Sequence, residues 1–98
     1  MLSRRVKRRI ASRMAAEKPT IRIGKFGVTD SLIEEVSKQL DARRTVKLKV
    51  LKSALIEKTI DEIANEVAFK TSSTLIEVRG HTFILFKRKS RSTRSSVK

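Results

Sequence analysis

Residues 20–30 read TIRIGKFGVTD, a stretch that combines the patterns of a strand, a glycine loop and a helix start. Segment 20–23 alternates apolar and polar side chains, which predicts a short strand with one buried face. Thr29 is a favourable N-cap residue, so a helix is expected to begin directly after it. Between the strand and the helix lies a GxxG loop, residues 24–27, which holds two of the three glycines in the chain.

The glycine loop has the composition of a phosphate-binding site. Glycine permits positive φ and lets another molecule approach the backbone closely. Helix N-termini attract anions through free N–H groups and the positive end of the helix dipole. Lys25 adds a charge within the loop, so the loop predicts contact with phosphates. The alternative is a strand-to-helix turn that needs glycine only for its shape.

The positive charge lies at the two ends of the chain. The net charge is +14: residues 1–27 carry +8, residues 28–80 carry zero, and residues 81–98 carry +6. A neutral centre with basic flanks is typical of a protein that binds a polyanion, and nucleic acid is the most common one.

An amphipathic basic helix is expected at the N-terminus. Apolar residues recur at every fourth position from Leu2 to Met14, and Pro19 follows. The other face is rich in arginine, and we expect these side chains to contact phosphates: Arg4, Arg5, Arg8, Arg9 and Arg13. Such a helix is also typical of a targeting peptide or a membrane-surface helix. Removal of a targeting peptide would leave the strand at Thr20 exposed, which favours phosphate contact.

The rest of the chain predicts two helices and three strands. The helix that follows Thr29 is expected to end near residues 42–44. Residues 45–51 predict the clearest strand, in which Val46, Leu48 and Val50 alternate with Lys47 and Lys49. After it, Ser53 is expected to cap a helix whose apolar stripe begins at Ile56. Two further strands, at 74–78 and 82–87, are expected to form an antiparallel hairpin.

The order helix, strand, helix, strand, helix, strand, strand predicts one compact α/β domain over residues 1–88, with helices packed on one sheet. Residues 89–98 are basic and serine-rich, so they are expected to be a disordered tail. Phe26 either stacks on a base or packs inward. The other three phenylalanines are expected in the core: Phe69, Phe83 and Phe86.

Several function classes are disfavoured by what the sequence lacks. It has no cysteine, a single histidine (His81) and no GxxxxGK[ST] loop. We therefore expect no enzyme, no metal site and no cofactor. No apolar run approaches the roughly 20 residues of a membrane span, so no membrane contact is expected. We expect a cytoplasmic monomer.

Three stretches resemble the CRM domain, the chloroplast RNA splicing and ribosome maturation domain: IRIGKFGVTDSLIEEV (21–36), VKLKV (46–50) and VRGHTFILFKR (78–88). The resemblance extends from about Leu2 to Arg88 and includes the basic helix. It implies three helices with a four-stranded sheet, and RNA binding through a loop comparable to the KH-like GxxG loop. For stand-alone members it implies association with precursor large ribosomal subunits.

Pattern and resemblance together give a set of expected RNA contacts. Beyond the helix arginines these are Gly24, Lys25, Phe26, Gly27, Arg22, Lys87 and Arg88. The chain departs from the family at two points. Phe86-Lys87 stands where relatives often have Tyr-Arg, and Phe26 stands where they often have a polar residue.

The function expected first is therefore RNA binding, with rRNA in precursors of the large ribosomal subunit as the partner. The glycine loop, the basic helix and the tail would form one basic face. An alternative is a basic DNA-architectural, chromatin-like protein, which would not need the glycine loop. A third is a protein-interaction module whose basic ends bind an acidic partner.

Overall fold

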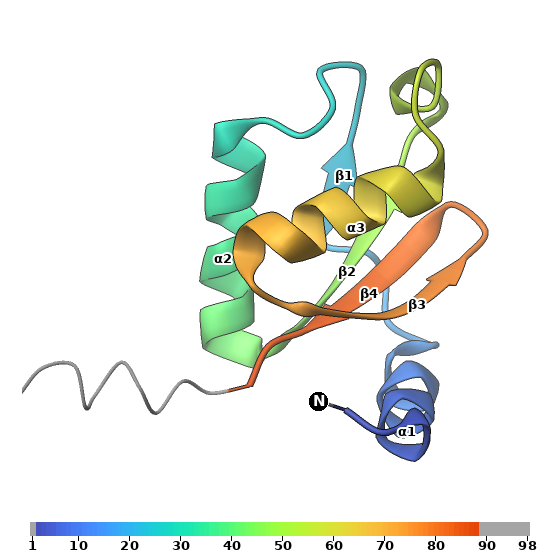
Figure 1. Cartoon of the computed structure of the whole chain (residues 1–98), viewed down its shortest axis with the longest axis vertical. Coiled ribbons are helices and arrows are strands. Elements are labelled where there is room, and N and C mark those ends of the chain that lie inside the picture. The colour runs from blue at the N-terminus through green and yellow to red at the C-terminus, as the bar shows by residue number, and fades with distance from the viewer. Residues whose placement is uncertain (1, 89–98) are drawn as a thin grey trace, which may run out of the picture.

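A computed structural model describes residues 2–88, and the predicted tail at 89–98 lies outside this range. The element order predicted from sequence is confirmed, with a short 3-10 turn (η1) added (Figure 1). The elements are α1 (Arg4–Met14), β1 (Ile21–Ile23), α2 (Asp30–Arg43), β2 (Thr45–Val50), η1 (Lys52–Ala54), α3 (Ile60–Thr71), β3 (Thr74–Arg79) and β4 (Thr82–Phe86).

The four strands form one mixed sheet in the order β1-β2-β4-β3. The strands β1 and β2 are parallel, as the crossover through α2 requires, and the other two pairs are antiparallel. Because side chains alternate along a strand, β2 presents Val46, Leu48 and Val50 to one face and Lys47 and Lys49 to the other.

The main core lies between the sheet and the pair α2 and α3. Strand residues on this face meet Val36 and Leu40 of α2 and Ile63 and Val67 of α3, all at most 1% exposed. Phe83 of β4 is the largest of the fully buried side chains. Since burying an aliphatic or aromatic side chain contributes about 1.5–3 kcal/mol, this layer supplies most of the stability.

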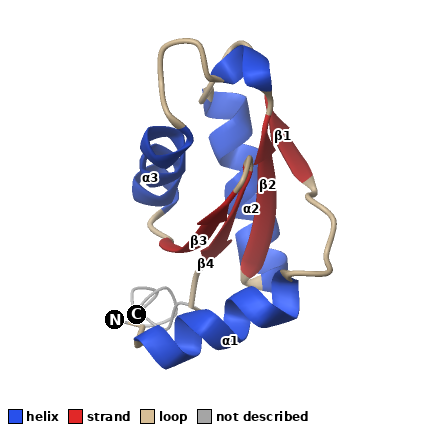
Figure 2. Cartoon of the chain, turned by 90° about the vertical axis from the view of Figure 1, so that its right-hand side faces the viewer, coloured by secondary structure: helices blue, strands red, loops and turns tan. Residues whose placement is uncertain are grey.

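The opposite face of the sheet is covered only in part, by α1. Ile10 and Ala11 of this helix pack on Ile76 of β3 and Ile84 of β4, in a cluster separate from the main core. Figure 2 shows α1 at one end of the sheet, and the other end of this face carries no helix.

Lys47 fixes the C-terminal end of α1 on this face. Its Nζ donates to the carbonyl oxygens of Met14, Ala15 and Glu17, at 3.2, 3.3 and 2.9 Å. The last carbonyls of a helix have no partner within the helix, so a lysine beneath them satisfies these acceptors and complements the dipole. The contact also ties α1 to β2, the second strand of the sheet.

The predicted start of α3 is wrong. Ser53 lies in η1, and Ile56, expected in the apolar stripe, is 82% exposed. The helix is capped instead by Thr59, whose hydroxyl accepts from the Glu62 amide while the Glu62 carboxylate accepts from the Thr59 amide. This capping box needs Glu or Gln at the third helical position, and the residue at that spacing from Ser53 is Ile56.

The phenylalanine predictions hold for two residues of three. Phe83 is fully buried, and Phe86 packs against the α1 cluster. Phe69 is 85% exposed, so its assignment to the core is wrong. It lies two residues from the buried Val67 and Thr71, which places it on the opposite side of α3.

Replacing Lys47 with methionine should loosen α1. The substitution keeps the aliphatic stem and removes three charge-assisted hydrogen bonds, so we expect the free energy of unfolding in urea to fall by about 1–3 kcal/mol. Lys49→Met, on the same strand face without a bonded partner among the described residues, should change it by less than about 0.5 kcal/mol. Equal losses in the two variants would contradict the anchoring role.

Candidate nucleic-acid interface

The glycine loop is a tight turn in which only one glycine is required by the backbone. The Gly27 amide donates to the Gly24 carbonyl oxygen at 2.9 Å, and Gly27 has a φ of +67°. A Cβ on Gly24 would meet Leu51 Cδ1 at 3.8 Å and Ser53 Oγ at 4.0 Å, which are ordinary contacts. The fold therefore explains Gly27, whereas the turn does not require a glycine at position 24. A Cβ on Gly27 would meet no atom within 4 Å, so the backbone is open to another molecule at that residue.

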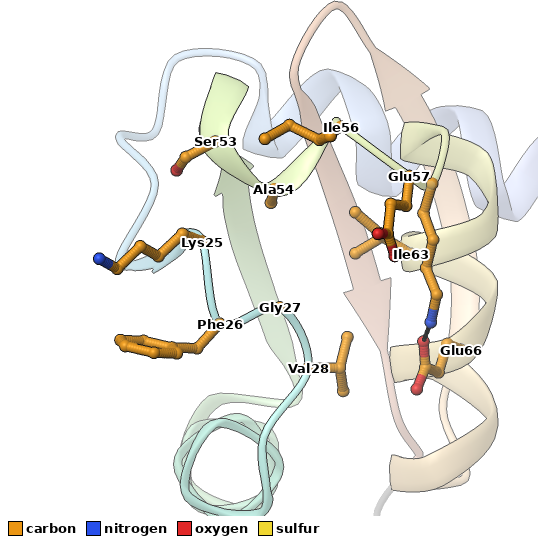
Figure 3. A pocket seen from close by; sticks show the side chains of 11 residues that line it. Lys25, Phe26, Gly27, Val28, Ser53, Ala54, Ile56, Glu57, Ile63 and Glu66 are labelled. Atoms are coloured by element: carbon orange, nitrogen blue, oxygen red, sulfur yellow. Dashed lines mark hydrogen bonds and ion pairs between the residues drawn. The ribbon is translucent and has the colours of Figure 1, made fainter.

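The two residues between the glycines project outward. Figure 3 shows the side chains of Lys25 and Phe26 extending from the same side of the loop, away from the α3 wall of the neighbouring cavity. Phe26 is 80% exposed, so the alternative that it packs inward is wrong. Lys25 Nζ lies 5.3 Å from the centroid of the Phe26 ring, within cation–π range. A charge and an aromatic face are thus presented together to solvent.

A cavity of about 400 Å³ separates the loop from η1 and the start of α3. Its far wall carries Glu57 and Glu66, and Glu66 is bound by Lys58 at 2.9 Å and Lys70 at 3.1 Å. The hydrogen bond from Lys58, then that from Lys70, lowers the pKa of Glu66, and the bond to Glu66 raises the pKa of Lys58. Because both lysines are paired with Glu66 and hold its pKa below the usual value, this wall disfavours a phosphate inside the cavity.

The start of α2 is less suited to an anion than its sequence indicates. Thr29 accepts from the Leu32 amide through its hydroxyl, at 3.1 Å, and from the Ile33 amide through its carbonyl, at 3.0 Å. Asp30 places a carboxylate in the first turn, at the positive end of the helix dipole. A phosphate is therefore better placed at the loop, near Lys25, than at the helix start.

The arginines of α1 form a solvent-exposed basic surface. The helix has no acid in its first turn, and none of its cations lies in an ion pair with a residue in the range 2–88. All five predicted residues are exposed: Arg4, Arg5, Arg8, Arg9 and Arg13. Figures 1 and 2 place α1 at one end of the molecule and the glycine loop at the other, so the fold does not bring these two predicted sites into contact.

The remaining predicted contacts occupy two places. Arg22 is exposed in the middle of β1, on the face opposite Ile21 and Ile23. Lys87 and Arg88 follow β4, where the Lys87 amide donates to the Arg44 carbonyl oxygen beside the end of α2. The exposed Arg22 is thus close to the loop in sequence, whereas the other two lie near the α1 end of the sheet.

Two exposed cations on the sheet were not predicted as contacts. Lys49 of β2 and Arg79 of β3 lie on the face that α1 covers only in part. The alternation of residues 45–51 predicted that Lys47 and Lys49 share a face. Periodicity alone does not show which face the helices leave open, so their availability was missed.

Comparison with known proteins identifies the family. Residues 2–87 match the family model of the CRS1 / YhbY (CRM) domain. The chain belongs to the CRM domain family. The match spans nearly all the described residues, so the resemblance seen in the sequence is confirmed together with its three helices and four-stranded sheet.

Two relatives match most of this CRM domain. The Bacillus subtilis (strain 168) protein named "Probable RNA-binding protein YqeI" is 30% identical over 87 residues, covering 89% of this chain and 88% of its own. The Methanocaldococcus jannaschii "Probable RNA-binding protein MJ0652" is 33% identical over 86 residues, covering 88% of this chain and 63% of its own. The chain therefore spans somewhat less than two thirds of the archaeal protein.

A solved structure has the same fold. The solution structure of the Staphylococcus aureus hypothetical protein SAV1595 aligns with a TM-score of 0.76 and 26% sequence identity, covering 93% of each chain.

Within residues 2–88 of the CRM domain, no helix is long and apolar enough to cross a bilayer, and no three His, Cys, Asp or Glu side chains gather as a metal site.

The two loop glycines of the CRM domain should respond differently to alanine. Gly27→Ala forces a side chain into the left-handed region and should lower the free energy of unfolding by about 1–2 kcal/mol. Gly24→Ala meets only ordinary contacts and should change it by less than about 0.5 kcal/mol. Thermal or urea unfolding followed by circular dichroism measures both, and the reverse order would contradict this geometry of the turn.

Proposed function

We propose that this CRM domain binds RNA, with the glycine loop as its contact to an unpaired strand. The observation that carries the proposal is the separation of charge. Seven of the ten acidic residues lie on α2 and α3. The exposed cations of α1, the loop and the free sheet face lie elsewhere. The relatives named as RNA-binding proteins support the same conclusion.

At the loop, both the backbone and the side chains would contact the RNA. Because no atom lies within 4 Å of where a Cβ on Gly27 would be, a phosphate can come close to the loop backbone there, while Lys25 supplies charge. Phe26 offers an exposed ring for an unpaired base, and stacking of this kind contributes about 1–3 kcal/mol per base. KH domains use a GxxG loop to hold about four nucleotides of backbone, which is the kind of contact proposed here.

The RNA proposed is ribosomal. For stand-alone members of the family, the CRM resemblance implies binding to rRNA in precursors of the large subunit, and we extend this role to the domain described here. On this account the protein acts in ribosome assembly, as a cytoplasmic monomer, by binding and not by catalysis. Its co-sedimentation with large-subunit precursors at low salt, and recovery of rRNA after crosslinking, are the expected results.

The loop is tested by a pair of matched variants. Lys25→Gln/Phe26→Gln removes one charge and one exposed ring and keeps both glycines. Phe69→Gln/Lys70→Gln makes the same change on α3, where Phe69 is 85% exposed. In fluorescence anisotropy with single-stranded rRNA fragments, the loop variant should lose about tenfold or more in affinity, since stacking and one phosphate contact are lost.

The α3 variant should stay within about twofold of the wild type on the same RNA, because it leaves the loop intact and removes a ring and a charge, the latter already paired with Glu66, from α3. Equal losses in the two variants would contradict a specific role for the loop. Equal affinity for duplex DNA and RNA, with no effect of the loop variant on either, would favour the DNA-architectural alternative.

A further inference from the structure

The sheet face beside α1 carries a row of residues that crosses all four strands. Arg22 of β1 is in register with Lys49 of β2, Lys49 with Thr82 of β4, and Thr82 with Arg79 of β3. Each of the four is next in its strand to a residue that packs in the main core. Because successive side chains point to opposite faces, all four lie on the face that α1 partly covers. We call these four residues the sheet row.

The sheet row is left uncovered where α1 ends. The next row of residues on this face, two positions along each strand and nearer to α1, contains Lys47, Ile84 and Glu77. In this row Lys47 pairs with Ile84, and Ile84 pairs with Glu77. That row is occupied, because Lys47 holds the last carbonyls of α1 and Ile84 is buried in the α1 cluster. The sheet row lies farther from α1, and its Arg22, Lys49 and Arg79 are exposed.

The charges of the sheet row are available to a ligand. Neither Arg22 nor Lys49 forms an ion pair with any residue that the structure describes. Arg79 is 75% exposed, and its Nε lies 3.3 Å from Glu77 Oε2. An ion pair at such an exposed site is worth about 0–1 kcal/mol, so a phosphate can compete for Arg79.

Position in the fold makes the sheet row a bridge between the two separated basic sites. Its Lys49 lies two residues from Lys47, which holds the C-terminal end of α1. Its Arg22 lies two residues before Gly24, where the glycine loop begins. The row itself spans three strand spacings, about 14 Å. A basic track therefore runs from α1 across the free half of the sheet towards the loop.

The chemistry of the sheet row favours a sugar–phosphate backbone over unpaired bases. Sheets that bind single-stranded RNA in RRM domains do so with aromatic side chains on which bases stack. The sheet row has three cations, one hydroxyl and no aromatic ring. Double-stranded RNA is recognised by its shape and by contacts to phosphates and 2′-hydroxyls, for which Arg, Lys and Thr are suited.

We propose that the sheet row and the arginine face of α1 together bind the backbone of double-helical RNA. This site is separate from the unpaired-strand contact proposed for the loop. It rests on the proposed function only in that RNA is the ligand. An RNA helix lies on α1 and the free half of the sheet, and the strand that leaves the helix reaches Lys25 and Phe26.

Three variants and two RNAs separate the sites. The row variant is Arg22→Gln/Lys49→Gln/Arg79→Gln. The control Lys38→Gln/Lys58→Gln/Lys70→Gln removes three cations from the α2 and α3 side, and Lys25→Gln/Phe26→Gln tests the loop. Each is titrated against a blunt RNA duplex and against a single strand, over a range of salt concentrations. Circular dichroism confirms that each variant is folded.

On the blunt duplex, the row variant should lose about tenfold or more in affinity, and its log–log salt slope should fall in magnitude by about 3, one for each phosphate contact removed. The control and the loop variant should stay within about twofold of the wild type on this duplex. Equal losses in the row variant and the control would overturn the proposal, as would wild-type affinity for a DNA duplex equal to that for RNA. Loss of single-strand binding in the loop variant concerns only the loop.

Glu77 supplies a test in which affinity should rise. It is the one acid on this sheet face among residues 2–88, and it pairs with Arg79. Glu77→Gln should strengthen duplex binding by about threefold, since a repulsive charge is removed and Arg79 is released. Glu35→Gln on α2, with the same net charge change, should have a smaller effect. Equal gains from both substitutions, or no gain from Glu77→Gln, would overturn the proposal.

Discussion

The alternation of β2 is the constraint on which the rest of the structure depends. Val46, Leu48 and Val50 are at most 2% exposed beneath α2 and α3, so Lys47 and Lys49 must point to the opposite face. Because β2 is hydrogen-bonded to β1 and β4, its orientation sets the orientation of Arg22 and, through β4, of Arg79. One apolar repeat thus determines which cations of the sheet reach solvent.

The same constraint gives the molecule two unlike sides. On the main-core side, α2 and α3 cover the sheet, leaving Leu75 and Val78 of β3 partly buried, and carry most of the carboxylates on their outer surfaces. On the other side, α1 packs at one end of the sheet, where Lys47 holds it, and leaves the rest of the face uncovered. The part of this sheet face that α1 leaves uncovered carries charged and polar side chains, so it exposes no hydrophobic surface to water. The incomplete cover is therefore stable, and it leaves a basic track available to a ligand.

Much of this arrangement could be predicted from the sequence. Periodicity gave the seven elements and their order, and the Thr29 cap was confirmed by its bond to the Leu32 amide. The start of α3 was misplaced because Ser53 has cap chemistry, yet lacks the reciprocal glutamate that Glu62 provides to Thr59. Phe69 is apolar, which suggested the core, but its spacing of two residues from the buried Val67 and Thr71 places it on the solvent side of α3.

The sequence marked the loop and the basic helix of the candidate site, but neither their layout nor the sheet cations Lys49 and Arg79. Glycine content and local charge marked the loop and the basic helix, since both signals are contiguous in sequence. Their separation to opposite ends of the sheet depends on where α1 packs, which is a tertiary contact between Ile10, Ala11 and two distant strands. The sheet row depends on register between four strands, which no local pattern contains.

Mapping the bound RNA onto the backbone amides by heteronuclear NMR tests the account most directly. The ligand is an RNA hairpin with a short single-stranded extension, titrated into the wild-type protein. Chemical shift changes should concentrate in α1, in Arg22 to Gly27, and around Lys49 and Arg79, and should leave the outer faces of α2 and α3 nearly unchanged. The largest changes on those two helices, with none at the loop or on the free half of the sheet, would contradict the account.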